Sequence, residues 1–324
     1  WAQMFAGFIF NEYGFLCTDY RRLVNDFQQY RPQHFAAVPL VVEKIYTTIW
    51  RTAERSGKAP LLRRGMAVSR VLMKFGIDKR RAIFKEIHRH LGGNLEMIIC
   101  GGAALDPAHE RDFYDMGILL LNGYGITECS PVVTVNRIDN FRFGSVGLPL
   151  PCNEIRIGDP DQNGVGEILV RGSNVTAGYY NDPEATAQVF DGEWFRTGDI
   201  GRIDSDGFLY FVGRKKNLIV LKNGQNIAPE ELEDKLARIP YVLEVLVYQE
   251  ENRIVGEFFL DEALEPDARE KLQADVRAFN RTMPTSKNIG IVRIRENEFP
   301  KTTSLKIKRN YDNRQPEEEQ VECV

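Results

Sequence analysis

The segment Gly123-Tyr124-Gly125-Ile126-Thr127-Glu128 combines residue types that could bind an anionic ligand. An apolar run at residues 118–121 leads into it, which predicts a strand followed by a turn built on two glycines. Glycines leave backbone amides bare, so an anion can approach them closely. Thr127 can donate a hydrogen bond to a phosphate oxygen, and Glu128 can bind a hard cation such as Mg²⁺. A strand-to-loop turn with a solvated glutamate accounts for the same residues.

A second pair of glycines follows an earlier apolar run. Residues 95–100 predict a short strand, and Gly101-Gly102-Ala103-Ala104 comes directly after it. Asp106-Pro107 then supplies an N-cap and a first helical residue, so a helix should connect this strand to the one at 118–121. Strand, helix and strand in this order predict two parallel strands. Both glycine turns should therefore lie beyond the carboxyl ends of strands in one sheet, where open α/β sheets bind ligands.

Upstream, the chain predicts one strand and several helices. Residues 35–39 predict a buried strand that ends at Pro39, and residues 41–55 predict a helix. Residues 61–91 predict one or two basic amphipathic helices. A basic helix can touch a membrane surface, although a solvated face is the commoner outcome.

Downstream of about residue 140, short alternating runs and glycines replace the helical pattern. Four predicted strands with turn clusters between them indicate a small, mostly antiparallel β subdomain, with a barrel as one option. A junction at residues 214–217 precedes an α+β pattern, in which the last strand is expected at 290–295. The predicted domains are 1–140 (the remainder of an α/β domain with a parallel sheet), 141–213 (its β-rich subdomain), 214–217 (a hinge), 218–311 (a small mobile α+β domain) and 312–324 (an acidic, disordered tail).

Composition excludes several classes of protein. The formal net charge of −4 gives no reason to expect a nucleic acid as a partner. Five cysteines without a CxxC pair disfavour a zinc or redox motif and fit a reducing compartment, so we predict a cytoplasmic location with peripheral membrane contact as an option. No apolar run approaches the ~20 residues of a membrane span. The sequence does not predict an oligomeric state.

Three later pieces carry groups suited to a nucleotide. Asp199, in Thr197-Gly198-Asp199, could accept two hydrogen bonds from the paired hydroxyls of a ribose, although a β-turn aspartate looks the same. Arg214 could reach the same sugar or a phosphate, or form a surface salt bridge. In the segment 300–309, Lys306 lies between two apolar residues, so packing can fix its position; the alternative is a basic tail.

In this order the pieces resemble the adenylate-forming superfamily of acyl-CoA synthetases, luciferases and peptide-synthetase adenylation domains. The matching segments span nearly the whole chain: Gly101-Gly102-Ala103, Tyr124-Gly125-x-Thr127-Glu128, 166–172, Thr197-Gly198-Asp199, Gly213-Arg214 and 300–309. Within the superfamily, residues 38–46, the basic helical segment and residues 84–105 look most like long-chain fatty acid–CoA ligases.

This resemblance implies a two-step reaction that uses ATP, Mg²⁺ and CoA. A fatty acid carboxylate attacks the α-phosphate of ATP to give acyl-adenylate and pyrophosphate, and the CoA thiol then displaces AMP. The implied roles are adenine contact for Gly101, Gly102, Ala103, Tyr124 and Gly125, α-phosphate contact for Thr127, Mg²⁺ binding for Glu128, ribose contact for Asp199 with Arg214 beside it, and adenylation catalysis for Lys306.

The resemblance also implies a rotation of the C-terminal domain between the two steps. Lys216, two residues after Arg214, would be the hinge, and the rotation would replace Lys306 by a face around Gly224 that borders the CoA channel. Leu305 stands where the family usually has glycine. The family's phosphate-binding loop is expected upstream of Trp1, so we expect this chain to be a fragment that alone cannot form acyl-adenylate.

Three alternatives stay open. The first is a sibling ligase for medium-chain, aromatic or carrier-protein-linked acids. The second is a non-catalytic nucleotide-binding module that keeps the fold. A dehydrogenase is the weakest, because Gly123-x-Gly125-x-x-Glu128 lacks the last glycine of the dinucleotide fingerprint.

Overall fold

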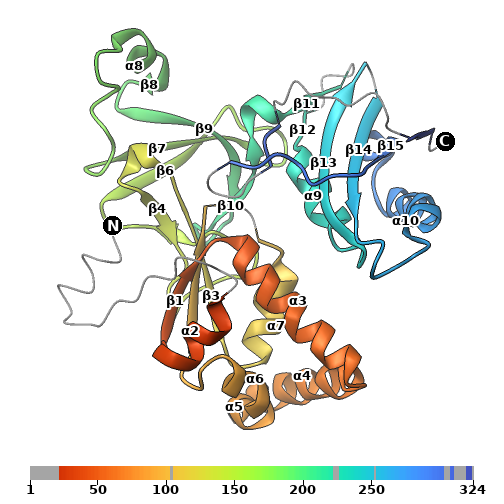
Figure 1. Cartoon of the computed structure of the whole chain (residues 1–324). Helices are drawn as coiled ribbons and strands as arrows, with labels where there is room; N and C mark the ends of the chain where they lie inside the picture. The colour runs from red at the N-terminus through yellow and green to blue at the C-terminus, as the bar shows by residue number, and fades with distance from the viewer. Residues whose placement is uncertain are drawn as a thin grey trace. The chain divides into compact units, whose positions relative to one another are not determined.

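The chain divides into two units, Trp1–Leu150 and Pro151–Val324 (Figure 1). This computed structural model describes residues 22–102, 105–221, 226–251, 253–302, 307–309 and 319–322, the last four by their backbone alone. The aromatic-rich start of the chain, before residue 22, lies outside the described residues.

The first unit is built on a five-stranded sheet. Its strands, in spatial order, are β1 (His34–Ala37), β2 (Met97–Gly101), β3 (Leu119–Gly125), β4 (Val132–Val135) and β5 (Leu148–Pro149). The first three strands are parallel, and β4 and β5 are antiparallel to their neighbours. The predicted strand–helix–strand unit with parallel strands is therefore confirmed for β2 and β3.

Six helices of this unit are described. They are α2 (Leu23–Tyr30), α3 (Pro39–Arg55), α4 (Ala59–Lys74), α5 (Arg80–Ile83), α6 (Lys85–His90) and α7 (Pro107–Asp115). Helix α7 begins as predicted, because the Asp106 carboxylate accepts a hydrogen bond from the Ala108 amide at 2.8 Å and Pro107 occupies the first turn. Phe113 of α7 is fully buried in one core with Ile98 of β2, which fixes the helix against the sheet.

Two predictions about the upstream elements were wrong in detail. Pro39 does not end a buried strand: β1 ends at Ala37, and Pro39 is the first residue of α3, where its missing amide hydrogen costs nothing. The strand is only partly buried because it is the outer strand of the sheet as far as the structure describes it.

Residues 61–91 hold three helices, not one or two. Helix α4 ends at Lys74, and Gly76 turns the chain with φ of +71°. The Asp78 carboxylate then accepts a hydrogen bond from the Arg80 amide at 3.0 Å, at the start of α5. A helix starts anew there because this carboxylate satisfies an amide that a continuous helix would pair internally.

The β3 strand also differs from the prediction. It runs through Gly125, so the two glycines expected in a turn lie within the strand. Gly123 to Gly125 pair with β4, and the turn comes later, at Thr127–Cys129, which forms one turn of 3-10 helix. The two glycines therefore let β4 lie close to β3; they do not reverse the direction of the chain.

In the second unit, a first sheet is antiparallel throughout, as predicted. Its strands are β6 (Asn153–Gly158), β7 (Gly166–Gly172), β9 (Trp194–Ile203) and β10 (Leu209–Arg214), in the order β10-β9-β7-β6, with β8 (Phe190–Asp191) on β9. Helix α8 (Pro183–Val189) precedes β8. Among the described residues β10 and β6 do not pair, so the sheet is open and the barrel option is wrong.

The remainder of the second unit is the predicted α+β pattern. A short ladder joins β11 (Ile219–Val220) to β12 (Asn226–Ile227), and a second sheet has the order β13 (Val242–Glu250), β14 (Arg253–Leu260), β15 (Ile289–Arg295) and β16 (Glu319–Glu322). Helices α9 (Pro229–Leu236) and α10 (Ala268–Thr282) share one core with this sheet, in which Leu232, Phe258 and Leu272 are fully buried.

The acidic tail departs from expectation over four residues. Glu319–Glu322 form β16, which pairs antiparallel with β15, so β15 is not the last strand and this part of the tail is not disordered. A strand with charged residues was hidden from the sequence pattern because an outer strand needs no apolar alternation. Within the described residues, no helix has both the length and the apolarity required to cross a bilayer.

Candidate functional site

In the first unit, the predicted residues gather at the carboxyl ends of β2 and β3. Gly101 ends β2 and is the register partner of Gly123 on β3. Gly102 follows with φ of +92°, a conformation that L residues other than glycine rarely adopt. Tyr124 is only 7% exposed.

Gly125 holds the end of β3 against the chain that returns as β4. A Cβ placed on Gly125 would lie 2.0 Å from the Pro131 carbonyl oxygen, so no larger residue fits. Thr127 and Glu128 follow on the 3-10 turn, the first exposed and the second half-buried, and Ser130 ends the turn with φ of +58°. The turn therefore presents a hydroxyl and a carboxylate just beyond the sheet edge.

Gly125→Ala should destabilise the first unit by at least about 2 kcal/mol, because the methyl group overlaps backbone atoms that β4 holds in place. Urea unfolding measures the effect. Gly290→Ala is the matched control, since its Cβ would meet nothing closer than 3.5 Å. Equal stability of the Gly125 variant and wild type would contradict the close approach.

Behind this edge lies a buried carboxyl group that the sequence did not predict as part of the site. Glu110 of α7 is 1% exposed, and its carboxyl accepts hydrogen bonds from the Asn122 side chain on β3 and from the Gly144 amide at 3.0 Å. Burial raises the pKa of Glu110 to about 8, even though both hydrogen bonds lower it. The group ties α7, β3 and the segment before β5 together just below Gly123.

We expect the stability of the first unit to fall as pH rises from about 5 to about 8, by up to about 1.4 kcal/mol per pH unit from this group. The folded state keeps the Glu110 proton until about pH 8, whereas an unfolded glutamate releases it near 4.5, so rising pH favours unfolding over this window. Urea unfolding of wild type and Glu110→Gln across the window tests this. A stability difference between the two that stays constant with pH would contradict it.

The residues present fit a magnesium ion that arrives with a nucleotide. Glu128 offers one half-buried carboxylate beside the exposed Thr127 hydroxyl. No group of three or more His, Cys, Asp or Glu side chains that could hold a metal occurs in the part of the chain that the structure describes. Mg²⁺ commonly takes one or two carboxylates and completes its shell with water and substrate phosphates, so a single glutamate suits it.

In the second unit, the structure brings Asp199 and Arg214 together. They are register partners on the antiparallel strands β9 and β10, and Arg214 Nε lies 3.2 Å from Asp199 Oδ1. The aspartate is 2% exposed, whereas nearly half of the arginine side chain faces solvent. Cross-strand pairing therefore brings the two residues into contact, which places Arg214 beside Asp199, while the ribose contact of either residue stays a prediction.

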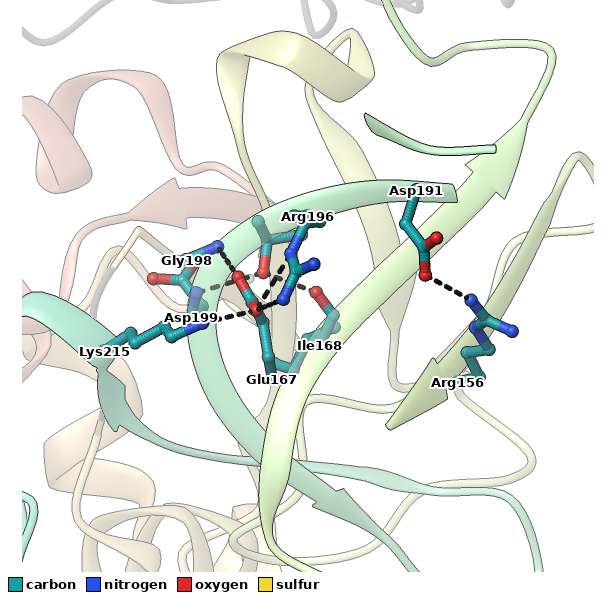
Figure 2. Close-up of polar contacts among 9 residues, drawn as sticks. Arg156, Glu167, Ile168, Asp191, Arg196, Gly198, Asp199 and Lys215 are labelled. Atoms are coloured by element: carbon teal, nitrogen blue, oxygen red, sulfur yellow. Dashed lines mark hydrogen bonds and ion pairs between the residues drawn. The ribbon is translucent and has the colours of Figure 1, made fainter. Parts of the chain in front are cut away.

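A second carboxylate, Glu167, supports the strand that carries Asp199 (Figure 2). Its Oε2 lies 2.8 Å from Lys215 Nζ and 3.1 Å from Arg196 Nη2, and its Oε1 accepts a hydrogen bond from the Gly198 amide at 3.2 Å. Burial alone would raise the pKa of Glu167, but Lys215 and Arg196 together hold it below its ordinary value. Glu167 thus fixes the backbone next to Asp199.

The sequence interpretation missed this network, because it used residues 166–172 only as a segment that resembles the family and assigned Glu167 no role. A glutamate directly before the apolar run at residues 168–170 was the available signal, since buried glutamates are almost always paired. Its cationic partners could not be identified without the fold.

The junction after β10 is a single 3-10 turn, Lys215–Asn217, as a connector between two elements often is. Lys215 binds Glu167 on the preceding sheet, and the Asn217 side chain donates a hydrogen bond to Glu230 of α9 at 2.6 Å. Lys216 lies between these two attachments and is exposed. This arrangement agrees with a hinge at Lys216, which stays a prediction.

Three predicted site residues, Ala103, Gly224 and Lys306, lie outside the described residues. The roles of the remaining ones, in adenine, phosphate, metal and ribose contact, also stay predictions, because the structure gives their positions and not their ligands.

Comparison with known proteins identifies relatives along most of the chain. The long-chain-fatty-acid–CoA ligase FadD15 of Mycobacterium bovis is 29% identical over 90% of this chain and 54% of its own length. The long-chain-fatty-acid–CoA ligase 5 of Mus musculus is 34% identical over 74% of this chain and 37% of its own length. The chain thus spans about half of the length of the first relative and less of the second.

The fold is shared with solved structures. The O-succinylbenzoate CoA synthetase (MenE) of Bacillus subtilis, in complex with its acyl-adenylate intermediate, superimposes with a TM-score of 0.70 at 21% identity, over 94% of this chain and 56% of its own. Residues 13–180, just over half of the 324 residues, match the AMP-binding enzyme family. The chain therefore belongs to the AMP-binding enzyme family.

Proposed function

We propose that the protein activates a long-chain fatty acid with ATP and transfers the acyl group to CoA, giving acyl-CoA, AMP and pyrophosphate. The observation that carries the proposal is the presence of Gly101, Gly102, Thr127 and Glu128 at the carboxyl ends of adjacent parallel strands, the edge at which α/β sheets bind ligands. The names of the relatives, which are long-chain-fatty-acid–CoA ligases, support the substrate class.

In the first step, a carboxylate oxygen of the acid attacks the α-phosphorus of ATP and pyrophosphate leaves. Negative charge grows on the phosphoryl oxygens, where the Thr127 hydroxyl and the Lys306 ammonium would stabilise it. Mg²⁺ held by Glu128 would supply further charge stabilisation. Asp199 would hold the ribose hydroxyls through charge-assisted hydrogen bonds, with Arg214 as its neighbour.

In the second step, the CoA thiolate attacks the acyl carbonyl carbon and AMP leaves with the bonding electron pair. We infer that the C-terminal domain turns about Lys216 between the steps, which moves Lys306 away and brings the face around Gly224 to the CoA channel. The attachments of Lys215 and Asn217 on opposite sides of Lys216 support this hinge.

The test is a pyrophosphate-release and acyl-CoA assay on the natural protein at its full length, with ATP, Mg²⁺, CoA and a panel of acids that includes palmitate. We expect turnover with long-chain acids. Preference for a medium-chain, aromatic or carrier-linked acid would identify a sibling ligase, and absence of turnover with every acid would refute the proposal. We expect the 324-residue chain alone to release no pyrophosphate, and turnover by it would overturn that part.

We also propose a cytoplasmic protein with peripheral membrane contact. Helix α4 carries several basic residues and exposes Leu61 (66%), and its C-cap residue Phe75 is also exposed (76%), which supports contact with an anionic surface. Phe75→Ser should lower co-sedimentation with anionic vesicles by about three-fold, which corresponds to a modest loss of buried apolar area. Leu264→Ser, at an exposed apolar site of the second unit, is the control. Equal sedimentation of wild type and the Phe75 variant would contradict the contact.

A further inference from the structure

We propose that Arg309 and Glu233 are positioning residues for Lys306, and that they act by fastening the segment that carries this lysine to the outer strand β13. The inference rests on the proposed function, because it assigns Lys306 to the adenylation step. Residues 303–306 lie outside the described residues, but the chain on both sides of them is described.

The C-terminal side of this segment is attached through Arg309. Its Nη2 lies 2.5 Å from Glu233 Oε2 on α9, and its Nη1 donates a hydrogen bond to the Val247 carbonyl at 3.2 Å. The Val247 amide in turn donates to Glu233 Oε1 at 2.6 Å. The ion pair thus satisfies both backbone groups of a buried residue on an outer strand, groups that would otherwise be costly to bury.

The N-terminal side is attached through Lys301. Its Nζ forms ion pairs with Glu244 of β13 and, at 2.7 Å, with Glu298. The other Glu244 oxygen accepts a hydrogen bond from the Phe299 amide at 2.8 Å. The same strand, β13, therefore holds the chain before and after residues 303–306.

The two sides are also joined to each other. Lys301 and Ile307 form an antiparallel bridge, and the Lys308 amide donates to the Pro300 carbonyl at 2.8 Å. This bridge ties the described chain before residues 303–306 to the described chain after them, and Arg309 holds the latter to α9 and β13. A shift of about 1 Å in a catalytic group can cost about 100-fold in rate, so loss of this anchor should be felt at Lys306.

A positioning role predicts a selective defect. Arg309→Ala should slow acyl-adenylate formation by about 10- to 100-fold with little change in the KM for ATP, because ground-state nucleotide binding uses other residues. Transfer of a supplied acyl-adenylate to CoA should stay within about two-fold of wild type, because Lys306 takes no part in it. Arg309→Lys should recover only part of the rate, since an ammonium cannot bind Glu233 and the Val247 carbonyl as a fork does.

The experiment measures both half-reactions in the full-length protein for wild type, Arg309→Ala, Glu233→Gln and the double variant. Lys287→Ala is the matched control, because Lys287 forms a comparable half-buried ion pair with Glu231 of α9 at 2.5 Å in the same unit. We expect the double variant to be no slower than Arg309→Ala, as for residues acting as one unit. Equal loss of both half-reactions, unchanged adenylation, or an equal adenylation defect in Lys287→Ala would overturn the positioning role.

Hydrogen exchange gives a second measurement that does not require activity. In Arg309→Ala, amides of residues 299–309 and of Val247 should exchange at least about ten-fold faster, and those of α10 should not. Unchanged exchange would overturn the attachment itself. Wild-type protein that forms no acyl-adenylate would refute the proposed function and with it the role toward Lys306, while the exchange result would still decide whether Arg309 holds the segment.

Discussion

Lys306→Ala should slow acyl-adenylate formation by about 10²- to 10³-fold and leave transfer of a supplied acyl-adenylate to CoA within about two-fold of wild type. In the proposed mechanism, the ammonium group would offset negative charge that develops on the α-phosphoryl oxygens, together with Thr127 and Mg²⁺. The second step develops no such charge at phosphorus, so it should not need this lysine.

Single-turnover assays of each half-reaction in the full-length protein measure the two effects separately. Lys308→Ala is the control, because it removes an ammonium group from the same segment and the Lys308 side chain is exposed. Adenylation that survives Lys306→Ala would favour a non-catalytic nucleotide-binding module or a different catalytic group.

Asp199→Ala should weaken AMP binding by about 100-fold or more, and should therefore impair both half-reactions. Two charge-assisted hydrogen bonds to the ribose hydroxyls are each worth about 1.5–3 kcal/mol, and 1.4 kcal/mol corresponds to a factor of ten in affinity. The effect on folding should be smaller, because Arg214, left without this carboxylate, is half-exposed and can be solvated.

Calorimetric titration with AMP measures the loss of affinity directly and needs no turnover. Asp204→Asn is the control, because Asp204 lies in the turn between β9 and β10 and its carboxylate accepts hydrogen bonds from the Asp206 and Phe208 amides, each at 3.0 Å. An Asp199 variant that binds AMP as tightly as wild type would exclude the ribose contact. A similar loss in the Asp204 variant would indicate damage to the sheet rather than to a binding group.

Together the Lys306 and Asp199 variants distinguish a group that acts in one half-reaction from a group that acts in both. A defect confined to adenylation is expected when a group acts only on the phosphoryl transfer, whereas a defect in both steps is expected when a group holds the adenosine that both steps share. The Arg309 variant should resemble the Lys306 variant in kind but be weaker.

Local patterns in the sequence determined much of the fold. The Asp106-Pro107 pair predicted the start of α7, and the apolar runs around it predicted the parallel strands β2 and β3. These features depend on capping, periodicity and turn chemistry within a few residues, which a sequence displays directly. The order of the motifs also predicted the family, since each motif is short and contiguous.

Only the tertiary structure decided which distant residues meet. Glu167 and Lys215 are 48 residues apart, and Glu233 and Arg309 are 76 apart, yet each pair forms an ion pair whose carboxylate is largely buried. The same holds for Asp199 and Arg214, which meet because of the register of two strands. Whether a charged residue is solvated or paired depends on burial and strand register, and neither is written in the neighbouring residues. The sequence therefore determined the elements and the candidate residues, while the packing of the elements determined how those residues are held.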